Sequence, residues 1–242
     1  MLALKEFRAG KAQFGAIVTA LSLIVFLALA LAALADGLFY GATGAIKQSN
    51  ATHYVFSDEA EGSFVRSRLE ASDVDAVAAV DGVEAAGPVG VLLTGGVGPN
   101  GPLDVAVFGI DPSTAGVPVT LVDGRLPEAG EDGGATGDIS LADEGAVIGT
   151  EVFVGDAGAT VVGIVDQTAF QLQPSMWTSV SPWRSMRDAV RPELRAQTNA
   201  INAIAVRVDA GADATVVAEQ ITAAVPGSAV LSADEAALAI PG

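Results

Sequence analysis

The stretch "NAIAVRVDAGADATVVAEQITAAVPGSAVLS", residues 202–232, has the order strand, helix, strand. Its first seven residues are mostly apolar and β-branched, which is typical of a strand. Asp213 is in position to cap a helix, which Pro226 and Gly227 would end. The apolar face of that helix consists of Val216, Val217, Ile221 and Val225. Residues 228–232 then return as a second strand.

The same order occurs earlier in the chain. Residues 52–57 are predicted to form a strand, a helix begins at Ser72 and ends near Asp81-Gly82, and residues 83–93 are again extended. Ala76, Val77 and Val80 share one face of this helix. Two such units can pair into one small sheet with both helices on a single face, as in ferredoxin-like folds. The predicted fold class is therefore α+β, with a split βαβ part.

Residues 95–195 separate the two units and have the composition of a strand-rich insertion. The expected strands are residues 103–110, 117–122, 145–150 and 159–165. One short helix is expected among them, with Ser181 as its cap and Pro182 at its first position. The acidic, glycine-rich residues 127–138 are expected to form a long, mobile loop.

Residues 14–35 carry no charge and would form a helix of about 33 Å, enough to cross a bilayer core. A secretory signal peptide is the alternative, because Ala33-Leu34-Ala35 matches a cleavage pattern, but its apolar region is usually about 7 to 15 residues. We therefore expect a retained transmembrane helix. Lys5, Arg8 and Lys11 precede it, so the N-terminus is expected in the cytoplasm and residues 36–242 outside the membrane.

The composition restricts the classes of partner and of site. The chain has no cysteine, which excludes disulfides and thiolate metal sites. Its formal net charge of -17 argues against nucleic acid and anionic lipid headgroups as partners. No phosphate-binding loop motif occurs, and the glycines between Gly95 and Gly101 are expected to form a turn between strands. We therefore expect ATP to be bound by another chain.

Side chains that could support catalysis or metal binding are few. His53 is the sole histidine, and no G-x-S-x-G motif accompanies it, so neither a zinc site nor a serine hydrolase is predicted. Four carboxylates could surround calcium, but their spacing is not that of an EF-hand. They are Glu128, Glu131, Asp132 and Asp138. We therefore expect that the chain is not an enzyme and that it has no catalytic, cofactor or metal site.

Three further patterns have a structural interpretation. Trp177 and Trp183 are expected to pack the insertion instead of forming a ligand cage. Gly124-Arg125 is expected to be a tight turn whose guanidinium binds nearby oxygens. The sequon at Asn50 is expected to be a chance match, because the alanine-rich, lysine-poor composition is typical of bacteria.

Several stretches, in this order after a span, resemble MacB/FtsX-like ABC transporter permeases. They are "DGVEAAGPV", "VFGIDPST", "LVDGRLPEAGED", "GAVIG", "ATVVGIVD" and "AIAVRVDAGADATVVAEQI". The resemblance extends from Leu4 to Gly242 and implies a ferredoxin-like part with a strand-rich insertion. Gly124-Arg125 is the most specific local match. The segment "TEVFVGDAG" is shorter than its family counterpart, so the insertion is expected to lack an element.

The family's permeases continue with three more spans, whereas this sequence stops at Gly242. Ser232 and Glu235 have the spacing of a capping box, so a helix is expected to begin there. We therefore expect the N-terminal portion of a longer permease. The predicted parts are a cytoplasmic basic segment (1–13), a transmembrane helix (14–35), the first core unit (36–94), the inserted subdomain (95–195), the second core unit (196–232) and the start of a connection to another span (233–242).

The resemblance implies a permease subunit of an ABC transporter complex in the cell membrane. A cytoplasmic ATPase partner would hydrolyse ATP, the permease would dimerise within membrane lipid, and the outer domain would export a substrate or act on an envelope partner. The substrate is unknown. The alternative is a secreted or singly anchored extracytoplasmic binding module with no ATPase partner.

Overall fold

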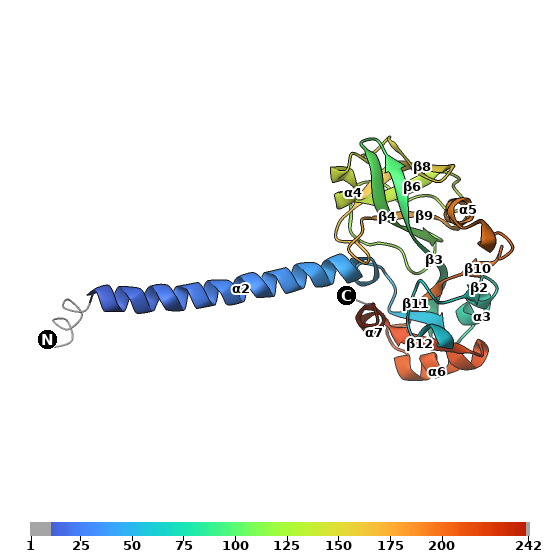
Figure 1. The fold of residues 1–242 in the computed structure, drawn as a ribbon. Helices are drawn as coiled ribbons and strands as arrows, with labels where there is room; N and C mark the ends of the chain where they lie inside the picture. Colours follow the sequence, from blue (N-terminus) through green and yellow to red (C-terminus); the bar gives the residue numbers. More distant parts are fainter. Residues whose placement is uncertain (1–10, 241–242) are drawn as a thin grey trace. The chain divides into compact units, whose positions relative to one another are not determined.

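The structure, a computed structural model, describes residues 11–240. It divides into two compact units, one ending at Phe39 and one beginning at Tyr40. Helix α2, Lys11–Lys47, supplies most of the first unit (Figure 1). Its stretch from Phe14 is long and apolar enough to cross a membrane, with a mean hydropathy of 2.8 and no buried residue in the most apolar part. Residues 1–10 of the predicted basic segment lie outside the described residues.

The last two turns of α2 belong to the second unit. Thr43, Ala45 and Ile46 are at most 2% exposed there. A loop donates backbone hydrogen bonds to this part of the helix, from Leu172 N to Gly41 O at 2.9 Å, and it accepts one from Ala45 N at Ala169 O. These contacts make residues 40–47 part of the domain core.

The first half of the domain is the ferredoxin-like sheet that the sequence predicts. It contains β1 (His53–Ser57), β3 (Val83–Gly98), β11 (Ala203–Val208) and β12 (Ser228–Ser232). Their order is β12-β1-β11-β3, and each neighbouring pair is antiparallel. Strand β2 (Leu69–Glu70) and helix α3 (Asp73–Ala78) lie between β1 and β3, and α6 (Ala214–Ala224) connects β11 to β12 (Figure 1). Each βαβ unit therefore encloses a strand of the other.

Both helices cover one face of this sheet. Val77 of α3 and Ile221 of α6 share a core cluster with Val206 of β11, and each of the three is fully buried. The other face carries Tyr54 and Phe56 of β1. This alternation follows from the period of two along a strand, and it confirms the predicted α+β class.

The insertion continues the same sheet. Strand β3 pairs with β11 up to Val89 and with β4 (Gly101–Ile110) from Val89 onward. It therefore runs without interruption through the predicted boundary at residue 95. The further order is β4-β9-β6-β8-β5, and β7 pairs with β3 and β8. These strands are β5 (Leu121–Gly124), β6 (Gly134–Asp138), β7 (Glu151–Val154), β8 (Ala157–Val165) and β9 (Ser175–Ser179).

Several predictions within the insertion are wrong. Residues 145–150 form turns, and the strand expected at 117–122 is β5, which begins only at Leu121. Buried strand β6 occupies the second half of the expected long loop at 127–138. Helix α5 is Val180–Val190 with Ser179 as its N-cap. Pro182 is therefore its third residue, a position whose N–H needs no partner within the helix.

Other predictions in the same region are confirmed. Strands β4 and β8 contain the expected residues 103–110 and 159–165. Helix α7 (Ala233–Leu238) begins with the predicted capping box between Ser232 and Glu235. The remaining short elements are 3-10 helices η1 (Asp58–Ala60) and η2 (Pro192–Leu194), strands β2 (Leu69–Glu70) and β10 (Ala200–Ile201), and helix α4 (Ile139–Asp143).

Candidate functional site

The structure does not gather the predicted chemical side chains into a reaction centre. His53 lies on β1 and hydrogen-bonds the neighbouring Thr52 hydroxyl through Nδ1 at 3.0 Å. Burial lowers the pKa of His53. Within residues 11–240, no group of three or more His, Asp or Glu side chains is placed to hold a metal ion.

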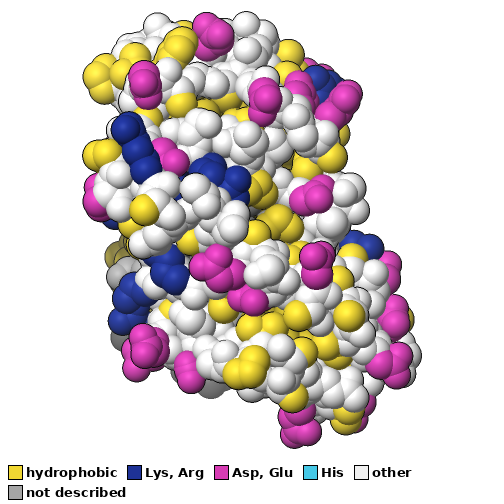
Figure 2. Space-filling model, turned by 90° about the vertical axis from the view of Figure 1, so that its right-hand side faces the viewer, with side chains coloured by type: hydrophobic (Ala, Val, Ile, Leu, Met, Phe, Trp, Pro, Cys, Tyr) yellow, Lys and Arg dark blue, Asp and Glu magenta, His cyan; other side chains and the backbone are white. Residues whose placement is uncertain are grey.

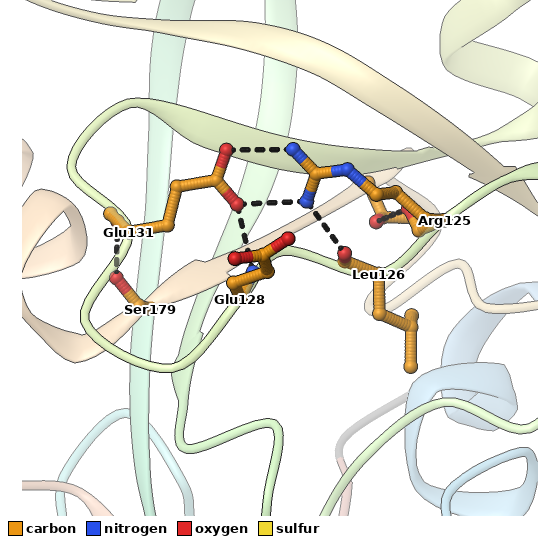
Figure 3. A network of polar contacts seen from close by, with 6 residues as sticks. Arg125, Leu126, Glu128, Glu131 and Ser179 are labelled. Carbon is orange, nitrogen blue, oxygen red and sulfur yellow. Dashed lines mark hydrogen bonds and ion pairs between the residues drawn. The ribbon is translucent and has the colours of Figure 1, made fainter.

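Glu131 and Arg125 form a two-pronged ion pair beside β6 (Figure 3). Arg125 Nη1 lies 2.8 Å from Glu131 Oε2, and Nη2 lies 2.9 Å from Oε1. Glu128 N donates to the same carboxylate at 2.7 Å, and Ser179 Oγ donates to the Glu131 carbonyl at 2.8 Å. The arginine and this amide lower the pKa of Glu131 to about 2, and the pair raises the pKa of Arg125. The acidic loop is therefore held by Arg125 at its start and by Ser179 at the end of β9.

Gly124 makes the turn that brings Arg125 to this carboxylate. Its φ is 70°, and a Cβ at this position would lie 2.3 Å from Val162 O. Arg125 N donates to the same carbonyl, and Thr136 Oγ1 donates to Arg125 O at 3.0 Å. The match to the family is thus a structural turn in which the arginine binds oxygens, as predicted.

The other two acidic candidates lie in different environments. Asp138 is 3% exposed and caps α4, accepting from Ser140 N at 3.0 Å. Its second oxygen accepts from Thr168 N at 2.7 Å and from Thr168 Oγ1 at 2.8 Å. Asp132 is exposed on the loop. The carboxylates considered for calcium therefore contact different groups and do not form one site.

The two tryptophans pack the core, as predicted. Trp177 stacks on Phe108 with ring centroids 4.3 Å apart, and its Nε1 donates to Ser175 Oγ. Trp183 of α5 lies on paired glycines of two strands, since a Cβ at Gly90 or Gly109 would come within 2.4 and 2.5 Å of it. These contacts leave neither ring free to form a cage.

Two smaller motifs also have structural tasks. The expected turn between strands is present but is limited to Pro99 and Asn100, because Gly95, Gly96 and Gly98 belong to β3 and Gly101 belongs to β4. The Asn50 carboxamide oxygen accepts from Gly116 N and Val117 N at 2.8 and 2.9 Å.

A cleft lined by arginines is the feature that the sequence interpretation missed. Its basic lining consists of Arg68, Arg187 and Arg191, and no acidic residue of the described chain lines it. The apolar lining includes Val65, Leu92, Leu93, Trp183 and Leu194. The enclosed free volume is about 30 Å³, room for a group of the size of a water molecule.

The sequence did contain a signal for this cleft. Eight arginines follow Lys47, and six of them lie within two short segments, residues 66–68 and 184–195. Strands β2 and β10 pair, and Asn202 Nδ2 donates to Ser67 O at 3.3 Å, which brings the two segments together. Figure 2 shows Lys and Arg side chains gathered along the left-hand side of the face that it draws, at middle height. The missing information was the pairing, which joins residues 130 positions apart.

The three arginines of the cleft differ in how they are held. Arg187 has a side chain 5% exposed, its Nε and Nη2 lie 2.8 and 2.7 Å from Asp188 Oδ1, and it stacks 5.3 Å above the Trp183 ring. Arg68 Nη1 donates to Val65 O at 2.9 Å and to Ser67 O at 2.6 Å. Burial, followed by Arg191 and Arg187, lowers the pKa of Arg68. Arg191 is exposed at the rim.

Comparison with known proteins identifies the architecture. The model of the MacB-like periplasmic core domain family matches residues 15–224. The periplasmic region of MacB from Actinobacillus actinomycetemcomitans is similar, with a TM-score of 0.56 and 17% identity, covering 78% of this chain and 92% of that one. The extracellular domain of the noncanonic ABC-type transporter YknZ from Gram-positive bacteria has a TM-score of 0.54 and 14% identity, covering 75% and 99%. Among curated proteins no match is found.

Proposed function

The chain belongs to the MacB-like periplasmic core domain family, and we propose that it is the permease subunit of an ABC transporter complex. In this proposal a partner subunit in the cytoplasm hydrolyses ATP. The outer domain uses that work to export a substrate or to act on an envelope partner.

One observation carries the proposal. Helix α2 is continuous from Lys11 to Lys47, and it is apolar enough to span a membrane in its first part and buried in the domain in its last two turns. A span that ends as part of a folded core is suited to a subunit whose outer domain responds to events in the membrane.

The distribution of chemistry supports a division of labour between subunits. The polar networks at Glu131 and Asp138 are satisfied internally and hold the fold. We propose that the chain has no catalytic site of its own, that its N-terminus is cytoplasmic, and that two permease chains assemble with the ATPase. Family membership supports each of these statements.

Cross-linking in intact membranes tests this function. The full chain is tagged at its C-terminus, cross-linked with a membrane-permeant reagent, purified in detergent and analysed by mass spectrometry. The expected result is an ATPase with nucleotide-binding motifs cross-linked to the chain and not to a tagged, unrelated single-span protein of the same membrane. Recovery of the chain with extracytoplasmic proteins alone would contradict the proposal and favour a singly anchored binding module.

A further inference from the structure

The cleft lined by Arg68, Arg187 and Arg191 combines positive charge with an apolar wall. Asp188 compensates Arg187, whereas no carboxylate of the described residues forms an ion pair with Arg68 or Arg191. In a chain with a net charge of -17, convergence of uncompensated arginines is not a general surface property. Fork-shaped guanidinium groups fit the two oxygens of a carboxylate.

Trp183 forms part of the wall of the same cleft. Trp183 is 1% exposed, lines the cleft, and its Nε1 has no hydrogen-bond partner in the described chain. Because that nitrogen is itself buried, the indole contributes an aromatic surface to the cleft and not a hydrogen-bond donor. The lining of the cleft thus has three guanidinium groups and an aromatic wall, but no acidic side chain of the described residues.

The surroundings restrict the kind of anion. Val65, Leu93 and Leu194 provide apolar contact beside the arginines. An open groove adjoins the cleft at Arg68, but Glu70 and Asp73 line that groove. A long acidic segment would therefore be repelled where it left the cleft, whereas one carboxylate joined to an apolar body would not.

We propose that the mouth of this cleft binds a carboxylate attached to an apolar group. The carboxylate lies between the exposed Arg68 and Arg191, and the apolar part lies outside the enclosed space of about 30 Å³, against the half-buried Val65, Leu93 and Leu194. The same chemistry is found in a small organic acid and in the C-terminus of a peptide that ends in an apolar residue. The inference concerns the extracytoplasmic domain alone and holds whether or not an ATPase partner is found.

Tryptophan fluorescence of the full chain in phosphatidylcholine nanodiscs tests the proposal. The chain contains two tryptophans, so Trp177→Phe leaves Trp183 as the reporter. N-acetyl-leucine should cause a saturable change, and N-acetyl-leucine amide, which lacks the charge, should cause none. The change should weaken as salt is added, because ions screen exposed charges.

Matched variants assign the effect to the cleft. Arg191→Gln, at the exposed rim, should lower the affinity for N-acetyl-leucine about tenfold, since one charge-assisted contact is lost. Arg207→Gln removes the same charge from β11, where Arg207 pairs with Glu84 at 2.9 Å, and should leave the affinity unchanged. Arg68→Lys keeps the charge but removes the planar fork, and should also weaken binding.

The outcomes separate the two sources and can overturn the proposal. Tighter binding of a capped tetrapeptide with a free C-terminal leucine than of N-acetyl-leucine would assign the cleft to peptide ends. Equal affinity would assign it to small organic acids. Absence of a saturable change with both acids, equal binding of the amide, or equal losses in Arg191→Gln and Arg207→Gln would overturn the proposal.

Discussion

Arg125 and Glu131 join the two ends of one loop through paired contacts of 2.8 and 2.9 Å between guanidinium and carboxylate. Glycine at 124 sets the direction of the arginine, and the Ser179 hydroxyl holds the Glu131 carbonyl. The loop therefore links the C-terminal end of β5 to the N-terminal cap of α5. An ion pair in this position makes stability depend on pH.

Glu131→Gln should lower stability at neutral pH and reduce the sensitivity of the domain to acid. The pKa of Glu131 falls from 4.5 to about 2 on folding. Its stabilisation is therefore complete above about pH 4.5 and is lost as the pH falls toward 2. The pair is partly exposed, so the loss at pH 7 should be about 1 kcal/mol or less. Thermal melts of the full chain in nanodiscs at pH 7 and pH 3 measure it.

The control for this prediction is Glu144→Gln, an exposed carboxylate for which no partner is found in the described chain. Its melting temperature should follow that of the parent at both pH values. A difference between parent and Glu131→Gln that is larger at pH 3 than at pH 7 would contradict the assigned role.

Asp138→Asn should destabilise the domain by about 2 kcal/mol, because an amide cannot accept on both sides as the carboxylate does. The carboxylate accepts from Ser140 with one oxygen and from Thr168 with the other, and the amide can keep only one of these two sets of contacts. Denaturant unfolding of parent and variant measures the effect. Asp132→Asn, on the exposed loop, should change stability by about 0.5 kcal/mol or less. Equal stability of the two variants would show that the buried hydrogen bonds of Asp138 do not stabilise the domain.

Val206→Asp should cost about 3 kcal/mol or more, since it leaves an unpaired charge in the core between the sheet and its two helices. Val206 is fully buried and pairs with His53 and Ala86 of the neighbouring strands. Asp132→Lys should shift the melting temperature little. A Val206→Asp chain that melts like its parent would show that β11 is not a central strand.

Cysteine accessibility tests the proposed orientation, and the chain has no native cysteine to interfere. Asp132→Cys, in the outer domain, should react with a membrane-impermeant maleimide in spheroplasts. Lys5→Cys should react only after the membrane is permeabilised. The reverse pattern would invert the topology, and loss of the Lys5→Cys site from the mature chain would show that the leader is cleaved.

Much of the ferredoxin-like half was predictable, because its signals are local. The apolar face with Val77 marks α3, and the cap at Asp213 together with Pro226 and Gly227 marks α6. The order of the four strands follows because two βαβ units of this kind can share one sheet. The cap at Ser232 was visible for the same reason.

The insertion was less predictable, because its elements depend on contacts distant in the sequence. The segment "GATGD" of β6 has small residues that disfavour strands, yet β8 and β9 flank it on both sides and bury it. The apolar "GAVIG" favours a strand, but Gly145 and Gly149 adopt positive φ and the segment turns. The arginine cleft was hidden because it depends on the pairing of two-residue strands β2 and β10.

ATP hydrolysis by the purified assembly tests the central claim most directly. The full chain is isolated from its membrane with its cross-linked or co-purified partner, reconstituted in nanodiscs, and assayed for vanadate-sensitive turnover beside the chain alone. The account predicts hydrolysis in fractions that contain both proteins and none with the chain alone. Two results would contradict it. One is turnover that scales with the concentration of the pure chain, and the other is purification of the chain from its membrane without any ATPase bound to it.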